Sequence, residues 1–155
     1  MKKLNKSVLA ILVFFCYVVM FLVALFLLRE LALGHYGNIE KLSNPFISFD
    51  YVLNTGAAFG LLKQQSAFLC GIAAFVLCFM IAYIFKNHKK ISDFEINILA
   101  MLFAGIIANT FERLQTGAVI DYINLNFINF PVFNIADLYI CLGAIILVFV
   151  VIFKR

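Results

Sequence analysis

The stretch NTFERLQTGAVIDYINLNFINFPVFNIAD, residues 109–137, lies between two long apolar runs and carries four charged side chains, Glu112, Arg113, Asp121 and Asp137. An ionisable group at the edge of a membrane span costs free energy unless it is paired or hydrated, so it marks a functional site by default. Two aspartates within one such stretch indicate acid–base chemistry on a bond that is to be broken. We expect the rest of the chain to serve as the scaffold that positions these residues.

The composition is that of an integral membrane protein. Of the 155 residues, 65% are hydrophobic and 13% are charged, and the mean hydropathy is +1.06. Soluble domains carry about a quarter charged residues. The length suits a single domain covering residues 1–155. The net charge of +4 is modest and forms no basic patch, so nothing indicates a nucleic-acid partner.

Four apolar runs predict an all-α membrane protein with four transmembrane helices. They cover about residues 7–28, 67–85, 95–113 and 134–153. The first run is longer than a signal-peptide core and no small-residue cleavage site follows it, so we expect it to be retained. Most of the 12 basic residues lie near the two termini or in the 86–90 connection. The positive-inside rule then places both termini and that connection in the cytoplasm.

Two extracytoplasmic segments are predicted to be extended. In FISFDYVL, residues 46–53, polar Ser48 and Asp50 alternate with apolar residues, which is typical of a half-buried strand. NTGAAFG, residues 54–60, follows as a turn. Gln115-Thr116-Gly117 reads as a helix stop, after which AVIDYI brings Asp121 back over the membrane face.

The two last spans place their charged residues at one depth. Glu95 to Arg113 spans about 27 Å of helix and Asp137 to Lys154 about 26 Å, against a hydrocarbon core of about 30 Å. If Glu95 and Lys154 mark the cytoplasmic boundary, Arg113 and Asp137 both lie at the outer one. We therefore expect an active site at the extracytoplasmic face.

Side-chain spacing groups further polar residues at this depth. Gly105, Asn109 and Arg113 share one face of the third span, where the glycine permits close approach of another helix. Asn134 and Asp137 share a face at the start of the fourth. Each group also has a plain structural explanation: a helix N-cap for Asn134-x-x-Asp137, an interfacial anchor for Arg113 and a loop acid for Asp121. Their coincidence at one depth favours function.

The cysteines and histidines do not indicate a metal site or a cofactor. Cys16, Cys70, Cys78 and Cys141 each lie in an apolar run without a CxxC or Cys/His cluster. They are predicted to be small buried hydrophobic residues. We expect no metal ligands and no cofactor.

Three ordered blocks resemble the lipoprotein signal peptidases, the type II signal peptidases, which are four-span aspartyl proteases of bacterial membranes. The blocks are NTGAAFG (54–60), NTFERLQTGAVID (109–121) and FNIAD (133–137). The resemblance implies a small extracytoplasmic β-element capping the helices and a multi-pass protein of the bacterial inner membrane. It also implies hydrolysis of a prolipoprotein just before a cysteine that carries diacylglycerol, with membrane lipid as a second partner and no obligate protein partner.

The resemblance also assigns roles to individual residues. It implies that Asp121 and Asp137 are the catalytic pair. The implied substrate-binding residues are Asn54, Gly56, Asn109, Arg113, Asn134 and Ala136. The small residues of the 54–60 block would give a peptide backbone room beside the pair.

The chain departs from the family pattern at four positions. Met20 and Ala24 stand about where the family usually carries an Asp and a Lys, Glu112 replaces an Asp, and Ala108 replaces a glycine. Because the implied catalytic residues are all present, we favour an active enzyme. A divergent paralogue that binds lipoprotein or lipid, and a small proton-relay transporter with the aspartates as relay groups, are the alternatives.

Overall fold

The computed structural model describes residues 6–34, 43–57 and 61–153. It contains four helices and two strands. In chain order these are α1 (Lys6–Ala32), β1 (Ile47–Asn54), α2 (Ser66–Asn87), α3 (Asp93–Thr116), β2 (Val119–Leu125) and α4 (Ile135–Phe153). All four helices are long and apolar enough to cross a membrane, and the strands form one antiparallel sheet. The predicted fold class, four transmembrane helices with a small β-element, is confirmed.

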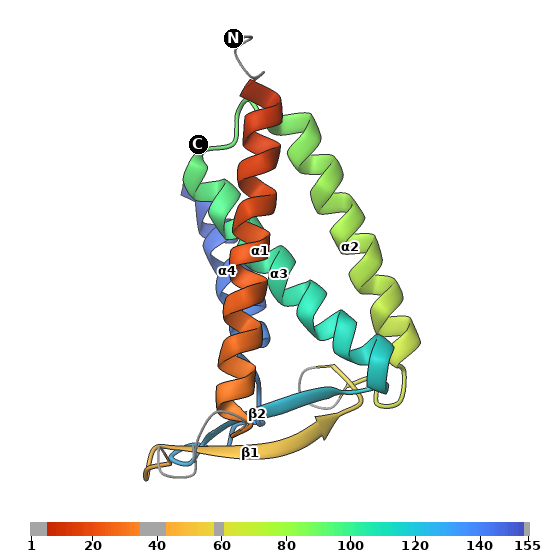
Figure 1. Cartoon of the computed structure of the whole chain (residues 1–155), viewed down its shortest axis with the longest axis vertical. Coiled ribbons are helices and arrows are strands. Elements are labelled where there is room, and N and C mark those ends of the chain that lie inside the picture. The colour runs from red at the N-terminus through yellow and green to blue at the C-terminus, as the bar shows by residue number, and fades with distance from the viewer. Residues whose placement is uncertain (1–5, 35–42, 58–60, 154–155) are drawn as a thin grey trace.

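The sheet lies across one end of the helix bundle (Figure 1). The start of α1 and the end of α4 both lie at the opposite end. Helices α1, α2 and α3 extend beyond the predicted apolar runs at both ends, and α1 continues past Arg29 and Glu30 to Ala32. That extension brings the charged last turn of α1 to the level of the sheet.

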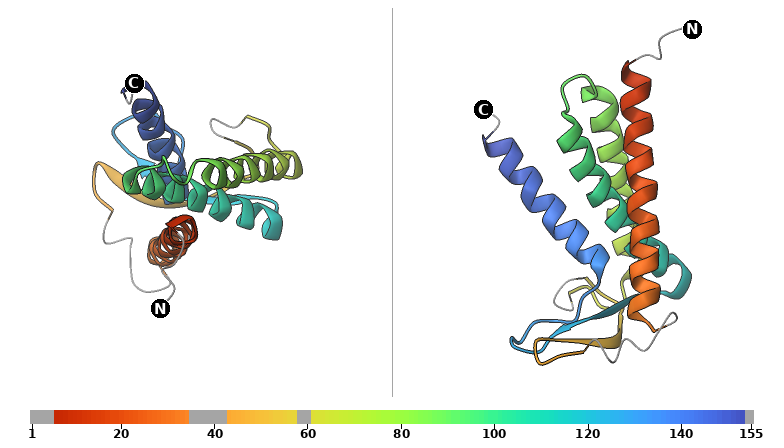
Figure 2. Two further views of the ribbon diagram at one scale, coloured as in Figure 1. Left: turned by 90° about the horizontal axis from the view of Figure 1, so that it is seen from above. Right: turned by 60° about the vertical axis from the view of Figure 1, so that its left-hand side comes forward.

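Helix α3 is the centre of the bundle and packs against each of the other three helices (Figure 2). Half of its most apolar 18-residue window is buried, against 11–17% in the other helices. The other helices therefore present most of their apolar surface outward, as a membrane protein does toward lipid.

Local sequence sets both ends of α3. At its start the Ser92 hydroxyl accepts from the Glu95 N–H, and the Glu95 carboxylate accepts from the Ser92 N–H at 2.8 Å, which forms a capping box. At its end Gly117 adopts φ 78°, and its N–H donates to Arg113 O at 2.9 Å. The predicted stop at residues 115–117 is confirmed, because glycine adopts this left-handed conformation without steric cost.

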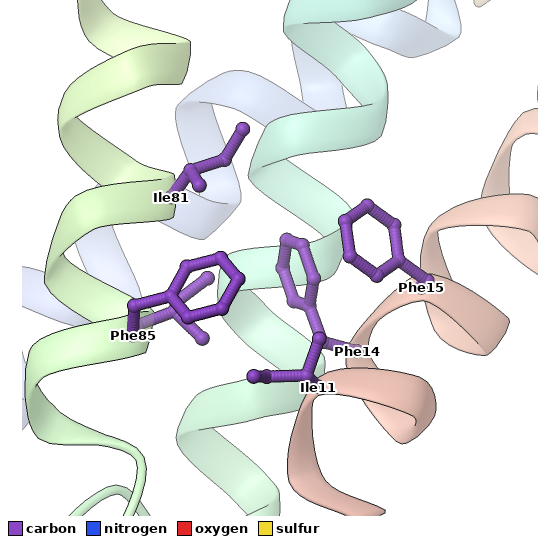
Figure 3. Close-up of a pocket in the computed structure, with 6 residues that line it drawn as sticks. Ile11, Phe14, Phe15, Ile81 and Phe85 are labelled. Carbon is purple, nitrogen blue, oxygen red and sulfur yellow. The ribbon is translucent and has the colours of Figure 1, made fainter. Parts of the chain in front are cut away.

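The half of the bundle remote from the sheet has an aromatic and aliphatic core. Phe14, 2% exposed, packs edge-to-face on Phe103 of α3 with ring centroids 5.4 Å apart. Figure 3 shows Phe14 and Phe15 of α1 across from Ile81 and Phe85 of α2. The hollow between them is only about 10 Å³ and has an apolar lining, so this half of the molecule serves packing.

Toward the sheet, α3 and α4 approach closely. A Cβ added at Gly105 would lie 2.8 Å from Ala136 O and 3.1 Å from Tyr139 Cβ, so a side chain at residue 105 would force the helices apart. The predicted role of Gly105 in close helix packing is confirmed. It lets the first turns of α4 lie directly against the middle of α3.

The sheet pairs Ile47 with Leu125 at one end and Asn54 with Val119 at the other. The prediction of a half-buried β1 is wrong, because residues 50–53 are all exposed and do not alternate. The register shifts between Phe49 and Val52, so the alternation breaks at mid-strand. Strand β2, which lies between β1 and the helix ends, is the buried strand.

The prediction that the cysteines are buried is also wrong for three of them. Cys16, Cys78 and Cys141 are exposed and Cys70 is intermediate, and all four are free thiols. In a bundle whose outer helices face lipid, a small apolar residue on a helix surface needs no burial inside the protein.

Candidate active site

The segment after β2 folds back on that strand and delivers Asn134 beside Asp121. Phe133 forms an antiparallel bridge with Ile123: its N–H donates to Ile123 O at 3.0 Å, and its carbonyl accepts from the Ile123 N–H at 2.8 Å. Asn134 follows immediately, and α4 begins at Ile135. The start of α4 is thus fixed to the strand that carries Asp121.

Each oxygen of the Asp121 carboxylate accepts a hydrogen bond from an asparagine amide. Oδ2 accepts from Asn54 Nδ2 at 2.9 Å, and Oδ1 accepts from Asn134 Nδ2 at 2.8 Å. Asn54 ends β1, 67 residues earlier in the chain. Asp121 is 3% exposed, so these bonds take the place of water around a carboxylate that lies almost wholly inside the protein.

The Asp137 carboxylate, on the first turn of α4, also accepts a bond at each oxygen. Oδ1 accepts from Asn109 Nδ2 at 2.8 Å, and Oδ2 accepts from the Asn134 N–H at 3.0 Å. In return the Asp137 N–H donates to Asn134 Oδ1 at 3.0 Å. The plain N-cap explanation of Asn134-x-x-Asp137 therefore describes real contacts. In addition, the bond from Asn109 holds the carboxylate against α3.

Asn134 joins the two carboxylates. Its side-chain amide donates to Asp121 and, at 3.2 Å, to Asn109 Oδ1, while its backbone N–H donates to Asp137. Asn134 and Asn109 are 4% and 6% exposed. The predicted residues Asp121, Asp137, Asn54, Asn109 and Asn134 thus form one hydrogen-bonded cluster.

Burial raises the pKa of Asp121 from 3.8 to about 6. The hydrogen bond from Asn54 opposes this shift, and the negative charge of Asp137 adds to it. A carboxyl group with a pKa near 6 exchanges its proton close to neutral pH, as a general acid or base must.

Arg113 extends from the last turn of α3 to the loop after β1. Its Nη2 donates to Gly56 O at 2.8 Å, and its Nη1 donates to Asn109 O at 3.4 Å. Among the described residues, Arg113 Nε is the buried side-chain polar atom without a hydrogen-bond partner. The site therefore contains one cationic N–H donor that the described protein atoms do not use.

Gly56 and Ala136 belong to the packing around the cluster. The Gly56 N–H donates to Asn54 Oδ1 at 2.9 Å, and a Cβ at Gly56 would lie 2.6 Å from Leu61 O. The space beside Gly56 is thus filled by the chain itself. This contradicts the expectation that it leaves room for a peptide, while Ala58 and Gly60 lie outside the described residues. Ala136 is 6% exposed and packs against Gly105.

A cavity of about 430 Å³ lies beside the cluster, between α1 and α3 and next to β2. Its lining is mostly apolar and includes Leu22 and Phe26 of α1 and Phe111 of α3, together with the cluster residues Asn109 and Asn134. An apolar space thus meets the polar cluster at its edge. Within the described part of the chain, no three His, Cys, Asp or Glu side chains gather as metal ligands would.

Sequence reasoning missed the contacts of two residues. Glu112 pairs with Arg29 of α1 at 2.6 Å and accepts from the Ile120 N–H at 2.8 Å. The sequence signal for this pair was the presence of opposite charges, Arg29 and Glu112, at the outer ends of the first and third apolar runs. Tyr122, whose OH accepts from the Ile135 N–H at 3.4 Å, was also missed, and burial raises its pKa to about 12.

Fold and site together define a four-helix membrane protein with two aspartates in one asparagine-rich cluster at the sheet end. The family model for signal peptidase (SPase) II matches residues 18–153. The chain belongs to the signal peptidase II family, and it is a protease and a multi-pass bacterial membrane protein.

Individual relatives agree with the family. The chain is 37% identical over 109 residues to the lipoprotein signal peptidase of Streptococcus agalactiae, with 70% of each chain covered. It is 33% identical over 131 residues to that of Clostridium tetani, with coverage of 83% and 81%. Two solved bacterial membrane enzyme structures, at 2.3 and 1.9 Å resolution, superpose with TM-scores of 0.71 and 0.68. Each is 26% identical to this chain. The alignment with the first covers 92% of this chain and 87% of the solved chain, and the alignment with the second covers 94% of both.

Proposed function

We propose that this protein is an aspartyl endopeptidase that removes the signal peptide from diacylglyceryl-modified prolipoproteins, cutting before the lipidated cysteine. The observation that carries the proposal is the placement of Asp121 and Asp137 on either side of Asn134, each with both carboxylate oxygens hydrogen-bonded. The names of the relatives support the substrate class.

In this mechanism the two carboxylates share one proton, because two such groups close together do not both ionise cheaply at neutral pH. The ionised one takes a proton from water, whose oxygen attacks the carbonyl carbon before the cysteine. The protonated one hydrogen-bonds the carbonyl oxygen and then protonates the departing nitrogen as the C–N bond breaks. The lipidated cysteine becomes the new N-terminus.

The surrounding residues serve binding and orientation. Asn54, Asn109 and Asn134 hold the carboxylates, and Arg113 Nε has an unused N–H with which to donate to a substrate carbonyl. The Gly56 carbonyl accepts a hydrogen bond from Arg113 and so fixes the guanidinium. Ala136 lines the cavity beside the cluster. Arg113 and Ala136 are thus in a position to contact substrate, while Gly56 and the three asparagines serve it by positioning Arg113 and the carboxylates.

The apolar cavity suits a lipid-anchored substrate that arrives from the bilayer. Its lining residues on α1 and α3 offer contact to an acyl chain or to the apolar part of a signal peptide. We place the sheet and the cluster at the extracytoplasmic face and both termini in the cytoplasm, as the lysine distribution favours. The location is the bacterial inner membrane, and membrane lipid is a partner.

The proton-relay alternative has less support. The segments 7–28, 67–85, 96–112 and 138–153 contain one charged residue, Glu112, and it lies near the sheet end. A relay across the membrane needs further ionisable groups along the path. Because Asp121 and Asp137 lie in one cluster, an active enzyme is favoured over a binding-only paralogue. This holds although the chain departs from the family pattern at Met20, Ala24 and Glu112.

The test is cleavage of a purified diacylglyceryl-modified prolipoprotein, with the unlipidated precursor as control. Asp121→Asn and Asp137→Asn should each lower kcat about a thousandfold or more, and the double variant should be hardly worse, because groups that act as a unit are non-additive. Asp50→Asn removes an exposed carboxylate bonded to Asn124 on the same sheet and should leave cleavage intact. Near-normal cleavage by either site variant would remove that aspartate from the mechanism.

A further inference from the structure

The carboxylate of Glu112 connects three elements of the fold. It lies near the end of α3, where Oε1 accepts from Arg29 Nε of α1 at 2.6 Å and Oε2 accepts from the Ile120 N–H of β2 at 2.8 Å. Arg29 and Glu112 lie 83 residues apart in the chain. One side chain therefore holds the end of the first helix and the strand of Asp121 at once.

Strand β1 pairs along one edge of β2, where Val52 is opposite Asp121. The bond to Ile120 lies on the side of β2 away from β1. On that side the N–H of Ile120 donates to Glu112, and the N–H of Tyr122 donates to Phe133 O at 3.0 Å. The amides on both sides of Asp121 are thus held, one by the loop that delivers Asn134 and the other by Glu112.

The ion pair lies in a partly dry environment. The side chains of Arg29 and Glu112 are 28% and 20% exposed, and a second Arg29 nitrogen, Nη1, donates to Glu30 at 2.7 Å. Both side chains line the cavity beside the cluster. At this degree of burial the guanidinium fixes the direction of the carboxylate more firmly than an exposed pair would.

We infer that Arg29 and Glu112 are positioning residues for the catalytic aspartate: the guanidinium orients the Glu112 carboxylate, which sets β2 through the Ile120 amide and so places Asp121. The inference rests on the proposed function and adds to it a link between the first helix and the dyad. It also gives a reason for glutamate at residue 112, because the extra methylene lets one carboxylate reach both Arg29 and β2.

Arg29 is available for this role because it lies in the last turn of α1, directly after a run of uncharged residues from Ser7 to Leu28. Between Ser7 and Ala32 the charged residues are Arg29 and Glu30 alone. The cation that meets α3 in this chain therefore comes from the last turn of α1, at the level of the sheet.

The kinetic test compares full-length variants on the diacylglyceryl-modified prolipoprotein. Glu112→Ala should lower kcat about ten- to a hundredfold, since a displacement of about 1 Å at a reacting group costs up to about a hundredfold, while KM changes about twofold or less. Arg29→Gln should lower kcat by a smaller factor, and Arg29→Lys should recover most of that loss. Arg29→Gln combined with Glu112→Ala should be no worse than Glu112→Ala, because Arg29 acts through Glu112.

A charge exchange separates positioning from a simple ion pair. Arg29→Glu combined with Glu112→Arg restores both charges but leaves the Ile120 N–H without its acceptor, so kcat should stay low. Recovery of kcat in this exchange would show that only the pair matters and would overturn the link to β2. The matched control is Asp50→Asn, which neutralises an exposed carboxylate on the same sheet.

Amide hydrogen exchange gives a readout that does not depend on cleavage. The Ile120 amide should exchange faster in Glu112→Ala and Arg29→Gln than in wild type and Asp50→Asn. Unchanged exchange together with unchanged kcat would overturn the inference. Absence of cleavage by the wild-type protein would instead overturn the proposed function, and the exchange data would still decide whether Glu112 holds β2.

Discussion

Replacement of Asp121 by asparagine should remove a large part of the pH dependence of stability as well as cleavage. Burial raises the pKa of Asp121 to about 6 in the folded protein, against 3.8 for an ordinary aspartate. At about 1.36 kcal/mol for each pH unit, this difference corresponds to about 3 kcal/mol. The folded state therefore binds more protons than the unfolded state between pH 4 and 6, and the wild-type protein loses about 2 kcal/mol of this stability as the pH rises through that window.

The asparagine variant has no charge to bury, but it loses one good hydrogen bond. Both neighbouring amides are fixed in orientation, since Asn54 Oδ1 accepts from the Gly56 N–H and Asn134 Oδ1 accepts from the Asp137 N–H. An asparagine at residue 121 can accept from one of them and opposes the other with its own NH2, at a cost of about 1–3 kcal/mol. The variant should therefore be the less stable protein at pH 4 and equal or more stable at pH 7.

The assay is chemical unfolding of both proteins in the same detergent at pH 4, 5, 6 and 7. The free energy of unfolding of Asp121→Asn minus that of wild type should rise by about 2–3 kcal/mol across the series, because burial is the largest cause of the Asp121 shift and groups outside the site contribute equally to both proteins and cancel. Asp50→Asn supplies the baseline for loss of an exposed carboxylate. A difference that stays constant from pH 4 to 7 would refute the assignment of a raised pKa to Asp121.

Two further predictions concern Arg113 and the orientation in the membrane. Arg113→Lys keeps the charge but loses the planar guanidinium that reaches Gly56 O at 2.8 Å, so kcat/KM should fall about ten- to a hundredfold. A wild-type kcat/KM would instead indicate that Arg113 is an interfacial anchor. Reporter fusions at residue 88 should read cytoplasmic and fusions at residue 125 extracytoplasmic, because the lysines cluster around residue 88; the reverse pattern would contradict the orientation.

Short-range patterns predicted much of this fold. The apolar runs are long, the stop at Gly117 needs only the local left-handed conformation, and Gly105 marks a close helix contact through its own lack of a side chain. The grouping of Asp137 with Asn109 followed from helix periodicity and from counting residues along two spans. These features depend on contacts within one element or on the depth of the membrane.

What the sequence did not reveal depends on partners far along the chain. Asn54 reaches Asp121 over 67 residues, and Arg29 reaches Glu112 over 83. Such pairs leave no periodic signal. The alternation in β1 predicted a buried face, but the register shifts between Phe49 and Val52, and residues 50–53 are exposed. The cysteines were misjudged because burial in lipid and burial in protein favour the same residue types.

The central position of α3 has a consequence for biogenesis. Helices α1 and α2 leave the ribosome first, yet each packs chiefly against α3, so most of their helix contacts form only when the third helix enters the bilayer. Strand β1 likewise waits for β2, and the last helix brings Asp137. The cluster is therefore assembled only when nearly the whole chain has been translated, because a nascent chain that stops before α4 lacks Asp137. Under the proposed mechanism such a chain should not act on precursors in the same membrane.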